Sequence, residues 1–264
     1  MNGLAHITET FNSLRAEGRA ALMPYFTLGY PTPDASLEVI EALAKSGADL
    51  IELGVPFSDP LADGTTIQRS TQVALEQGMN VRRCLELVAQ ARSRGVQQPL
   101  LLMGYVNPIL AYGIERYVVD ACRAGVEGLI VPDLPLEEAD ALDAACRQHG
   151  LALVYLVSPA STPERIAALA ERTSGFLYLV SLTGVTGARD SLPTNLADFV
   201  ARVRAVARTP LAVGFGIATP EQARNVAGLA DGVIIGSALI GAAGKSDHPA
   251  EAAGNYIKGI RAAL

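Results

Sequence analysis

Tryptophan is absent from the sequence, aromatic residues are few, and no run of basic residues occurs anywhere in its 264 positions. The formal net charge is −6. Proteins that bind nucleic acids usually carry a basic patch, so this class is excluded. The cysteines Cys84, Cys122 and Cys146 are odd in number and lack the spacing of metal ligands or redox pairs. We therefore expect reduced cysteines in or near helix cores.

Long apolar segments are also missing. Residues 1–18 contain no apolar core of the kind that a signal peptide carries. No apolar run in the rest of the chain reaches the length of a membrane span. These absences predict a soluble cytoplasmic protein.

What the sequence does contain is a recurring pattern of a short aliphatic run, turn residues, and then an Ala-, Glu- and Arg-rich stretch with helical spacing. The predicted strands are 21–28, 49–55, 99–106, 128–131, 152–157, 176–181, 211–215 and 232–235. The predicted helices are 6–17, 34–46 with Asp34 as its N-cap, 67–76, 81–94, 114–124, 136–148, one starting at Thr162 and Pro163, 196–207, one starting near 220, and 250–263.

Eight strand-then-helix units in a chain of this length predict a (β/α)8 barrel. We expect a single domain over residues 1–264, with an extra N-terminal helix and a short phosphate-binding helix after the eighth strand. An open doubly wound sheet is the alternative. No GxGxxG motif follows the first strand, so a dinucleotide-binding version of that sheet lacks its main signature.

Function in such barrels lies at the carboxyl ends of the strands, and basic residues are scarce there. The lysines and histidines all lie elsewhere, at Lys45, Lys245, Lys258, His6, His149 and His248. A Schiff-base lysine, a zinc site and a histidine base are therefore disfavoured. The titratable groups at the predicted strand ends are Tyr25, Glu52, Asp59, Asp63, Tyr105, Asp133 and Tyr178. They indicate acid–base chemistry that needs no metal.

Glu52 is the strongest candidate, because it lies inside a predicted buried strand. Strand alternation puts Ile51, Leu53 and Val55 on one face, which suits the helices, and turns Glu52 into the barrel near its mouth. Desolvation should raise the pKa of this carboxyl toward neutrality, as a general acid–base needs. A structural ion pair is the alternative interpretation, but no arginine lies on a neighbouring predicted strand.

Three aspartates in the following loops are weaker candidates. Asp63 lies in a loop bounded by Pro and Gly, and a single loop Asp is usually a turn former or a helix N-cap. Asp59 and Asp133 each stand near a proline in the same kind of turn, which favours a structural role more strongly.

Glycines mark the ends of the last two strands, as Gly214-Phe215-Gly216 and Gly236-Ser237. Barrels often bind a phosphate group between these two loops, at the start of a short helix. Tight packing of glycines at strand ends is the alternative. The loop 183–187, with Thr186 between two glycines, is either a closing lid or an ordinary surface loop.

Several of these motifs resemble one known family. ELGVPFSDPLADG at 52–64 with Thr-Ile-Gln after it, TLGYP at 27–31, the segment 178–187 and the two glycine motifs are similar to the tryptophan synthase α subunit. The resemblance covers nearly the whole chain. It implies cleavage of indole-3-glycerol phosphate to indole and glyceraldehyde 3-phosphate, a retro-aldol lyase reaction of tryptophan biosynthesis.

The resemblance also implies a role for individual residues. Glu52 would move protons between the substrate C3′ hydroxyl and indole C3, and Asp63 would bind the indole N–H. The implied substrate-binding residues are Tyr25, Ile67, Met103, Ile130, Tyr178, Thr186, Gly187, Gly214, Phe215, Gly216, Gly236 and Ser237. The first four line the indole pocket, and the last five lie around the phosphate.

A partner is implied as well. Family members bind a β subunit as an αββα heterotetramer, and pyridoxal phosphate belongs to that subunit, so we expect no cofactor or metal in this chain. The implied interface residues are Pro56, Phe57, Ser58, Asp59, Asn107 and Pro108. Two other interpretations stay open. One is a different phosphate-binding barrel, such as an isomerase or indole-glycerol-phosphate synthase. A synthase of that type would need lysines at the strand ends, and this chain has none there. The other is a subunit that only activates its partner.

Overall fold

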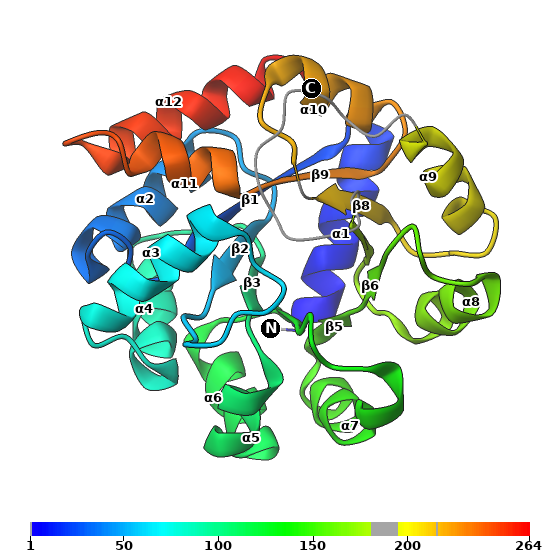
Figure 1. Ribbon diagram of the computed structural model, residues 1–264, viewed down its shortest axis with the longest axis horizontal. Helices are drawn as coiled ribbons and strands as arrows, with labels where there is room; N and C mark the ends of the chain where they lie inside the picture. The colour runs from blue at the N-terminus through cyan, green and yellow to red at the C-terminus, as the bar shows by residue number, and fades with distance from the viewer. Residues whose placement is uncertain (1, 181–194, 215) are drawn as a thin grey trace.

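The computed structural model describes residues 2–180, 195–214 and 216–264. Parallel strands form one sheet in the order β5-β4-β3-β2-β1-β9-β8-β7-β6, and helices surround it (Figure 1). The strands are β1 (Ala21–Thr27), β2 (Ile51–Gly54), β3 (Leu100–Met103), β4 (Gly128–Ile130), β5 (Ala152–Val154), β6 (Leu156–Val157), β7 (Leu177–Val180), β8 (Leu211–Gly214) and β9 (Gly232–Ile235).

The helices on the outside follow the strands in turn. They are α2 (Pro33–Lys45), α3 (Thr65–Glu76), α4 (Val81–Ser93), α5 (Val106–Tyr112), α6 (Ile114–Ala124), the 3-10 turn η1 (Leu136–Glu138), α7 (Asp140–His149), α8 (Pro163–Arg172), α9 (Leu196–Arg204), α10 (Pro220–Ala227), α11 (Ser237–Ala243) and α12 (Pro249–Arg261). Within the described residues, no helix is both long and apolar enough to cross a membrane.

The predicted fifth strand is divided at Tyr155. β5 pairs with β4 and β6 pairs with β7, while the Tyr155 carbonyl between them accepts the Tyr178 N–H at 3.0 Å. The sheet therefore closes through this one continuous segment, and the eight predicted strands become nine pieces of one barrel. This confirms the (β/α)8 barrel and rules out the open doubly wound sheet.

The start of α2 corrects one detail of the sequence analysis. Thr32, not Asp34, is the N-cap, and its hydroxyl accepts the Ala35 N–H at 3.2 Å. Pro33 is the reason. Proline favours an extended residue before it and itself fits the first position of a helix. Thr32 is extended, with φ −138° and ψ 160°.

Two other boundaries were also wrong. The third strand was predicted to reach Val106, but it ends at Met103 and α5 begins at Val106. Pro108 lies in the first turn of that helix, where a missing N–H costs nothing. The predicted helix 136–148 is broken at Ala139 into η1 and α7. The cysteines are free, as expected, with Cys84 and Cys146 buried.

The helix α1 (Gly3–Ala16) covers the amino-terminal end of the barrel, where Figure 1 shows it crossing behind the strands. Gly3 lies so close to Glu127 that a Cβ there would be 2.6 Å from the Glu127 Cα. The buried Glu127 carboxylate joins three elements: it contacts His6 Nδ1 and Arg92 Nη2, both at 2.6 Å, and accepts the Leu100 N–H at 3.0 Å. This end of the barrel is therefore closed and structural, and the other end is open for function.

Replacing Glu127 by Gln should lower the free energy of unfolding by roughly 1–3 kcal/mol, because Arg92 and the Leu100 N–H lose a charged acceptor in a buried site. Urea denaturation measures the change. Glu9→Gln, on the exposed side of α1, is the matched control and should be neutral. Equal stability of the two variants would show that Glu127 does not hold this end together.

Candidate active site

Glu52 lies in β2 with its side chain inside the barrel and is completely buried. Neither carboxylate oxygen has a hydrogen-bond partner among the described residues. Burial alone raises the pKa of this carboxyl to about 8, because a charge is poorly solvated there. The alternative interpretation, a structural ion pair, is therefore not supported within the described residues. Glu52 is a carboxyl group that can exchange protons near neutral pH.

Two tyrosines lie beside Glu52, and glycines make room for both. Tyr25 in β1 pairs with Glu52 in the strand register. A Cβ on Gly54 would be 2.0 Å from the Tyr25 hydroxyl, and one on Gly214 would be 2.4 Å from the Tyr178 hydroxyl. Burial raises the pKa of both phenols well above the usual value. A nearby carboxyl group is the second cause in each case: Asp63 raises the pKa of Tyr25, and Glu52 raises the pKa of Tyr178. Both phenols therefore stay protonated and can donate hydrogen bonds.

Asp63 comes from the loop between β2 and α3. It is 5% exposed. Its N–H donates to the Pro60 carbonyl at 3.0 Å, and its carbonyl accepts the Gln68 side-chain amide at 2.8 Å. Burial raises the pKa of the Asp63 carboxyl to about 6, and hydrogen bonding with Tyr105 opposes part of the rise. At neutral pH this group is mainly ionised, whereas Glu52 is mainly protonated.

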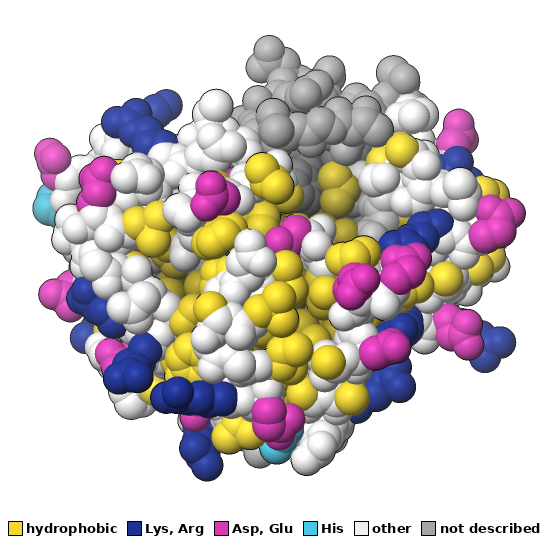
Figure 2. Space-filling view, turned by 60° about the horizontal axis from the view of Figure 1, so that its bottom comes forward, with side chains coloured by type: hydrophobic (Ala, Val, Ile, Leu, Met, Phe, Trp, Pro, Cys, Tyr) yellow, Lys and Arg dark blue, Asp and Glu magenta, His cyan; other side chains and the backbone are white. Residues whose placement is uncertain are grey.

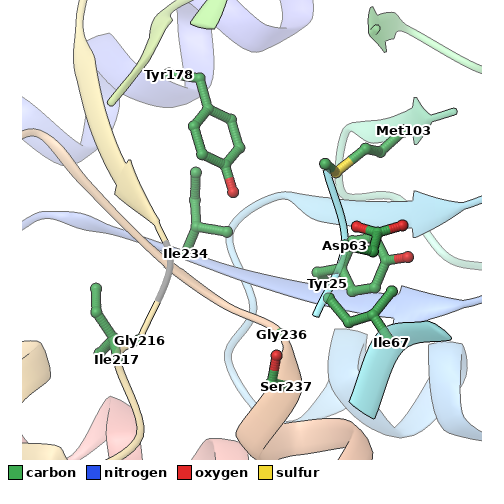
Figure 3. A pocket seen from close by; sticks show the side chains of 10 residues that line it. All are labelled: Tyr25, Asp63, Ile67, Met103, Tyr178, Gly216, Ile217, Ile234, Gly236 and Ser237. Atoms are coloured by element: carbon green, nitrogen blue, oxygen red, sulfur yellow. The ribbon is translucent and has the colours of Figure 1, made fainter. Parts of the chain in front are cut away.

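A cavity at the open end of the barrel brings Tyr25, Tyr178 and Asp63 together, whereas Glu52 is fully buried and is not part of the described lining. Its described lining consists of Tyr25, Asp63, Ile67, Met103, Tyr178, Gly216, Ile217, Ile234, Gly236 and Ser237. Figure 3 shows the Asp63 carboxylate beside the Tyr25 ring, with Tyr178 reaching in from the opposite side. Ile67 and Met103 supply an apolar wall next to Asp63. The cavity thus offers a flat apolar space with an anion at one edge.

The other edge of the cavity is formed by backbone from β8 and β9. Gly216 has φ +87°, a conformation that favours glycine. Gly236 precedes α11, and Ser237 is the first residue of that helix, whose first N–H groups have no partner within the helix. The described lining contains no Lys or Arg. An anionic group bound here would be held by N–H and O–H donors.

The structure brings together most, but not all, of the predicted substrate-binding residues. Ile130 is fully buried in β4 and pairs with Met103, and Gly214 packs against the Tyr178 ring. Both residues are next to lining residues but are not in the described lining themselves. Thr186, Gly187 and Phe215 lie outside the described residues.

Sequence reasoning missed two lining residues, Ile217 and Ile234. Ile234 lies in β9, two residues before Gly236, so strand alternation predicts that both residues face the same side. Ile217 comes directly after Gly216 and carries no signal of its own in the sequence.

Four of the predicted partner residues, Pro56 to Asp59, lie on the loop after β2, but Asn107 and Pro108 lie in the first turn of α5 and not on a loop. Ser58, Asp59 and Asn107 are exposed, Phe57 and Pro108 are half-buried, and Pro56 is buried. With the side of the molecule that carries α5 and α6 turned forward, Figure 2 shows hydrophobic side chains gathered over the middle of this face.

The fold and the site define a (β/α)8-barrel enzyme with buried carboxyl groups and tyrosines around the open end of the barrel. Comparison with known proteins identifies the family. The family model of the tryptophan synthase alpha chain matches residues 11–259, and the chain belongs to this family. The alpha chain is a lyase that cleaves indole-3-glycerol phosphate in tryptophan biosynthesis.

Individual relatives agree with this assignment. The tryptophan synthase alpha chain of Chloroflexus aggregans is 55% identical over 234 residues, which cover 89% of this chain and 88% of the relative. A structure of Mycobacterium tuberculosis tryptophan synthase superposes with a TM-score of 0.91 at 42% identity, covering 98% and 97% of the two chains. The alpha chain from Legionella pneumophila superposes with a TM-score of 0.90 at 39% identity, covering 100% and 97%.

The raised pKa of Glu52 predicts how stability depends on pH. The protonated carboxyl is favoured in the folded state, so its contribution is complete below about pH 4.5 and is lost as the pH rises toward about 8. Between pH 5 and 8, the free energy of unfolding should fall by roughly 3 kcal/mol more in the natural chain than in Glu52→Gln. Urea denaturation across this range measures both. Glu86→Gln, an exposed change on α4, should behave like the natural chain, and parallel curves for all three would contradict the buried-acid description.

Proposed function

We propose that Glu52 and Asp63 carry out the cleavage of indole-3-glycerol phosphate to indole and glyceraldehyde 3-phosphate. The observation that supports this most is the pair of buried carboxyl groups with separated pKa values, about 8 and about 6. Two carboxyls whose environments separate their pKa values are suited to different tasks in one reaction. Nothing in the proposed reaction needs a cofactor, and family membership is consistent with none in this subunit.

Glu52 would act first as an acid and then as a base. Its carboxyl proton passes to C3 of the indole ring, which leaves the ring nitrogen positively charged. The resulting carboxylate then takes the proton of the C3′ hydroxyl. As that O–H bond breaks, C3′ becomes the aldehyde carbon, and the electrons of the C3–C3′ bond return to the ring. A pKa near neutrality suits both transfers.

Asp63 would stay ionised and stabilise the intermediate. Its carboxylate accepts a hydrogen bond from the indole N–H and offsets the positive charge that develops on the ring. In a site with little water, this interaction is stronger than it would be in solution. Tyr25, Ile67, Met103 and Ile130 would shape the indole pocket, and Tyr178 would stand next to Glu52.

The phosphate would bind at the β8 and β9 end of the cavity. The proposed contacts are Gly214, Phe215, Gly216, Gly236 and Ser237. Backbone N–H groups at glycines and at a helix start suit an anion, which fits a site whose described lining has no basic side chain. Thr186 and Gly187, which lie outside the described residues, are further proposed substrate-binding residues.

A β-subunit partner follows from family membership. We propose an αββα heterotetramer in the cytoplasm, in which pyridoxal phosphate belongs to the β subunit. The proposed contact residues are Pro56, Phe57, Ser58, Asp59, Asn107 and Pro108. They lie on the rim of the same barrel mouth that holds the cavity, so a partner there could receive indole directly.

Glu52→Gln should reduce the rate of indole release from indole-3-glycerol phosphate by roughly 10²–10⁴-fold, because the amide cannot transfer the protons. The fold and the affinity for substrate should persist, since the two side chains have nearly the same shape. Steady-state assays and calorimetry measure the two effects, with Glu86→Gln as control. Indole release at a near-natural rate in Glu52→Gln would exclude this mechanism.

Gly236→Asp should weaken the binding of glycerol phosphate at least tenfold, because it places a negative charge beside the proposed phosphate. Gly241→Asp is the matched control: it adds the same charge to α11, where a new Cβ meets no atom within 4 Å. Isothermal titration calorimetry compares them. If the two variants bind equally well, the phosphate lies elsewhere.

A further inference from the structure

The loop that carries Asp63 depends on a side chain from another part of the barrel. The Ala62 N–H donates a hydrogen bond to the Tyr105 hydroxyl at 3.0 Å. Among the described residues, no other hydrogen bond joins the backbone of 56–63 to a side chain outside 56–68. Pro60 and Gln68 bind the Asp63 backbone from within this segment, and Tyr105 ties the neighbouring Ala62 to another part of the barrel.

Tyr105 is well placed to act as a fixed support. It is 5% exposed, and its ring lies 5.5 Å from the Phe57 ring, centroid to centroid. Burial is the main cause that holds the pKa of its phenol far above the usual value, and the nearby Asp63 charge is the second cause. The hydroxyl therefore keeps its proton, so that its oxygen can accept from Ala62 while its hydrogen is free for the Asp63 carboxylate.

We propose that Tyr105 is a positioning residue for Asp63 and that it couples the partner-facing helix α5 to the catalytic carboxylate. The proposal rests on the role of Asp63 given above. Tyr105 holds the Ala62 N–H through its oxygen and orients the Asp63 carboxylate toward the cavity through its proton. It does not touch the reacting atoms.

The coupling follows from the place of Tyr105 in the chain. It stands directly before α5, whose first N–H, from Val106, donates to Asp133 Oδ1 at 2.9 Å. Large exposed hydrophobic side chains lie on both sides of the Tyr105–Ala62 hydrogen bond: Leu61 is 84% exposed and Leu110, on α5, is 54% exposed. A β subunit that covers both leucines would contact the loop that carries Ala62 and the helix that follows Tyr105 at the same time.

Several titratable groups surround Tyr105 and Asp63. Tyr25 from β1, Tyr178 from β7 and Tyr105 itself all interact with the Asp63 charge. Glu52 interacts with Tyr25 and Tyr178, and Asp133 interacts with Tyr105. Because Tyr105 supplies hydrogen bonding that lowers the pKa of Asp63, its loss should raise that pKa.

Tyr105→Phe tests the proposal, since it removes the hydroxyl and keeps the ring that packs on Phe57. We expect kcat for indole-3-glycerol phosphate cleavage to fall roughly tenfold with little change in KM. The acidic limb of the pH profile of kcat/KM should move to higher pH. The factor by which the β subunit raises the rate should also shrink, and the Ala62 amide should lose protection from hydrogen exchange.

Tyr112→Phe is the matched control. It removes a hydroxyl from the end of α5 that donates to Asp120 at 2.8 Å, away from Asp63, and should leave all four readouts unchanged. If Tyr105→Phe also keeps the natural rate, pH profile and activation while Asp63→Asn is inactive, the role of Tyr105 is wrong and the proposed function stands. If Asp63→Asn is fully active, the proposed function itself fails. An unprotected Ala62 amide in the natural chain would overturn the proposal without any variant.

Discussion

The barrel holds a carboxyl group, Glu52, where water does not reach it and no described side chain hydrogen-bonds to it. An ionised carboxylate in such a place costs several kcal/mol, so the group keeps its proton to an unusually high pH. The cost arises because β2 is paired on both sides, with β1 and β3, and the packed interior keeps water away from the carboxyl. The raised pKa of Glu52 is therefore produced by the surrounding core rather than by a neighbouring charge.

Close packing inside the barrel also shapes the space around that carboxyl. Gly54 and Gly214 leave room for the hydroxyls of Tyr25 and Tyr178. A side chain at either glycine would displace one of these phenols. In the proposed mechanism, proton transfer and substrate fit thus depend on the same few contacts.

Asp63 follows a different principle, because it lies on a loop rather than on a strand. Loops carry groups that must move or meet a partner, and they need outside contacts to be placed accurately. Here the contact comes from Tyr105, at the start of α5, with exposed Leu61 and Leu110 nearby. Partner binding and orientation of the second carboxylate can therefore share one mechanical link.

The sequence alone determined the barrel, the inward direction of Glu52 and the glycine-rich ends of the last strands, because these follow from local periodicity. Alternation of Ile51, Leu53 and Val55 sufficed for Glu52. Only the tertiary structure decided the break at Tyr155, the burial that sets the pKa of Glu52, and the support of Ala62 by Tyr105. That last pair is 43 residues apart. Such contacts depend on how distant segments meet around the barrel, and no local pattern of residue types records that meeting.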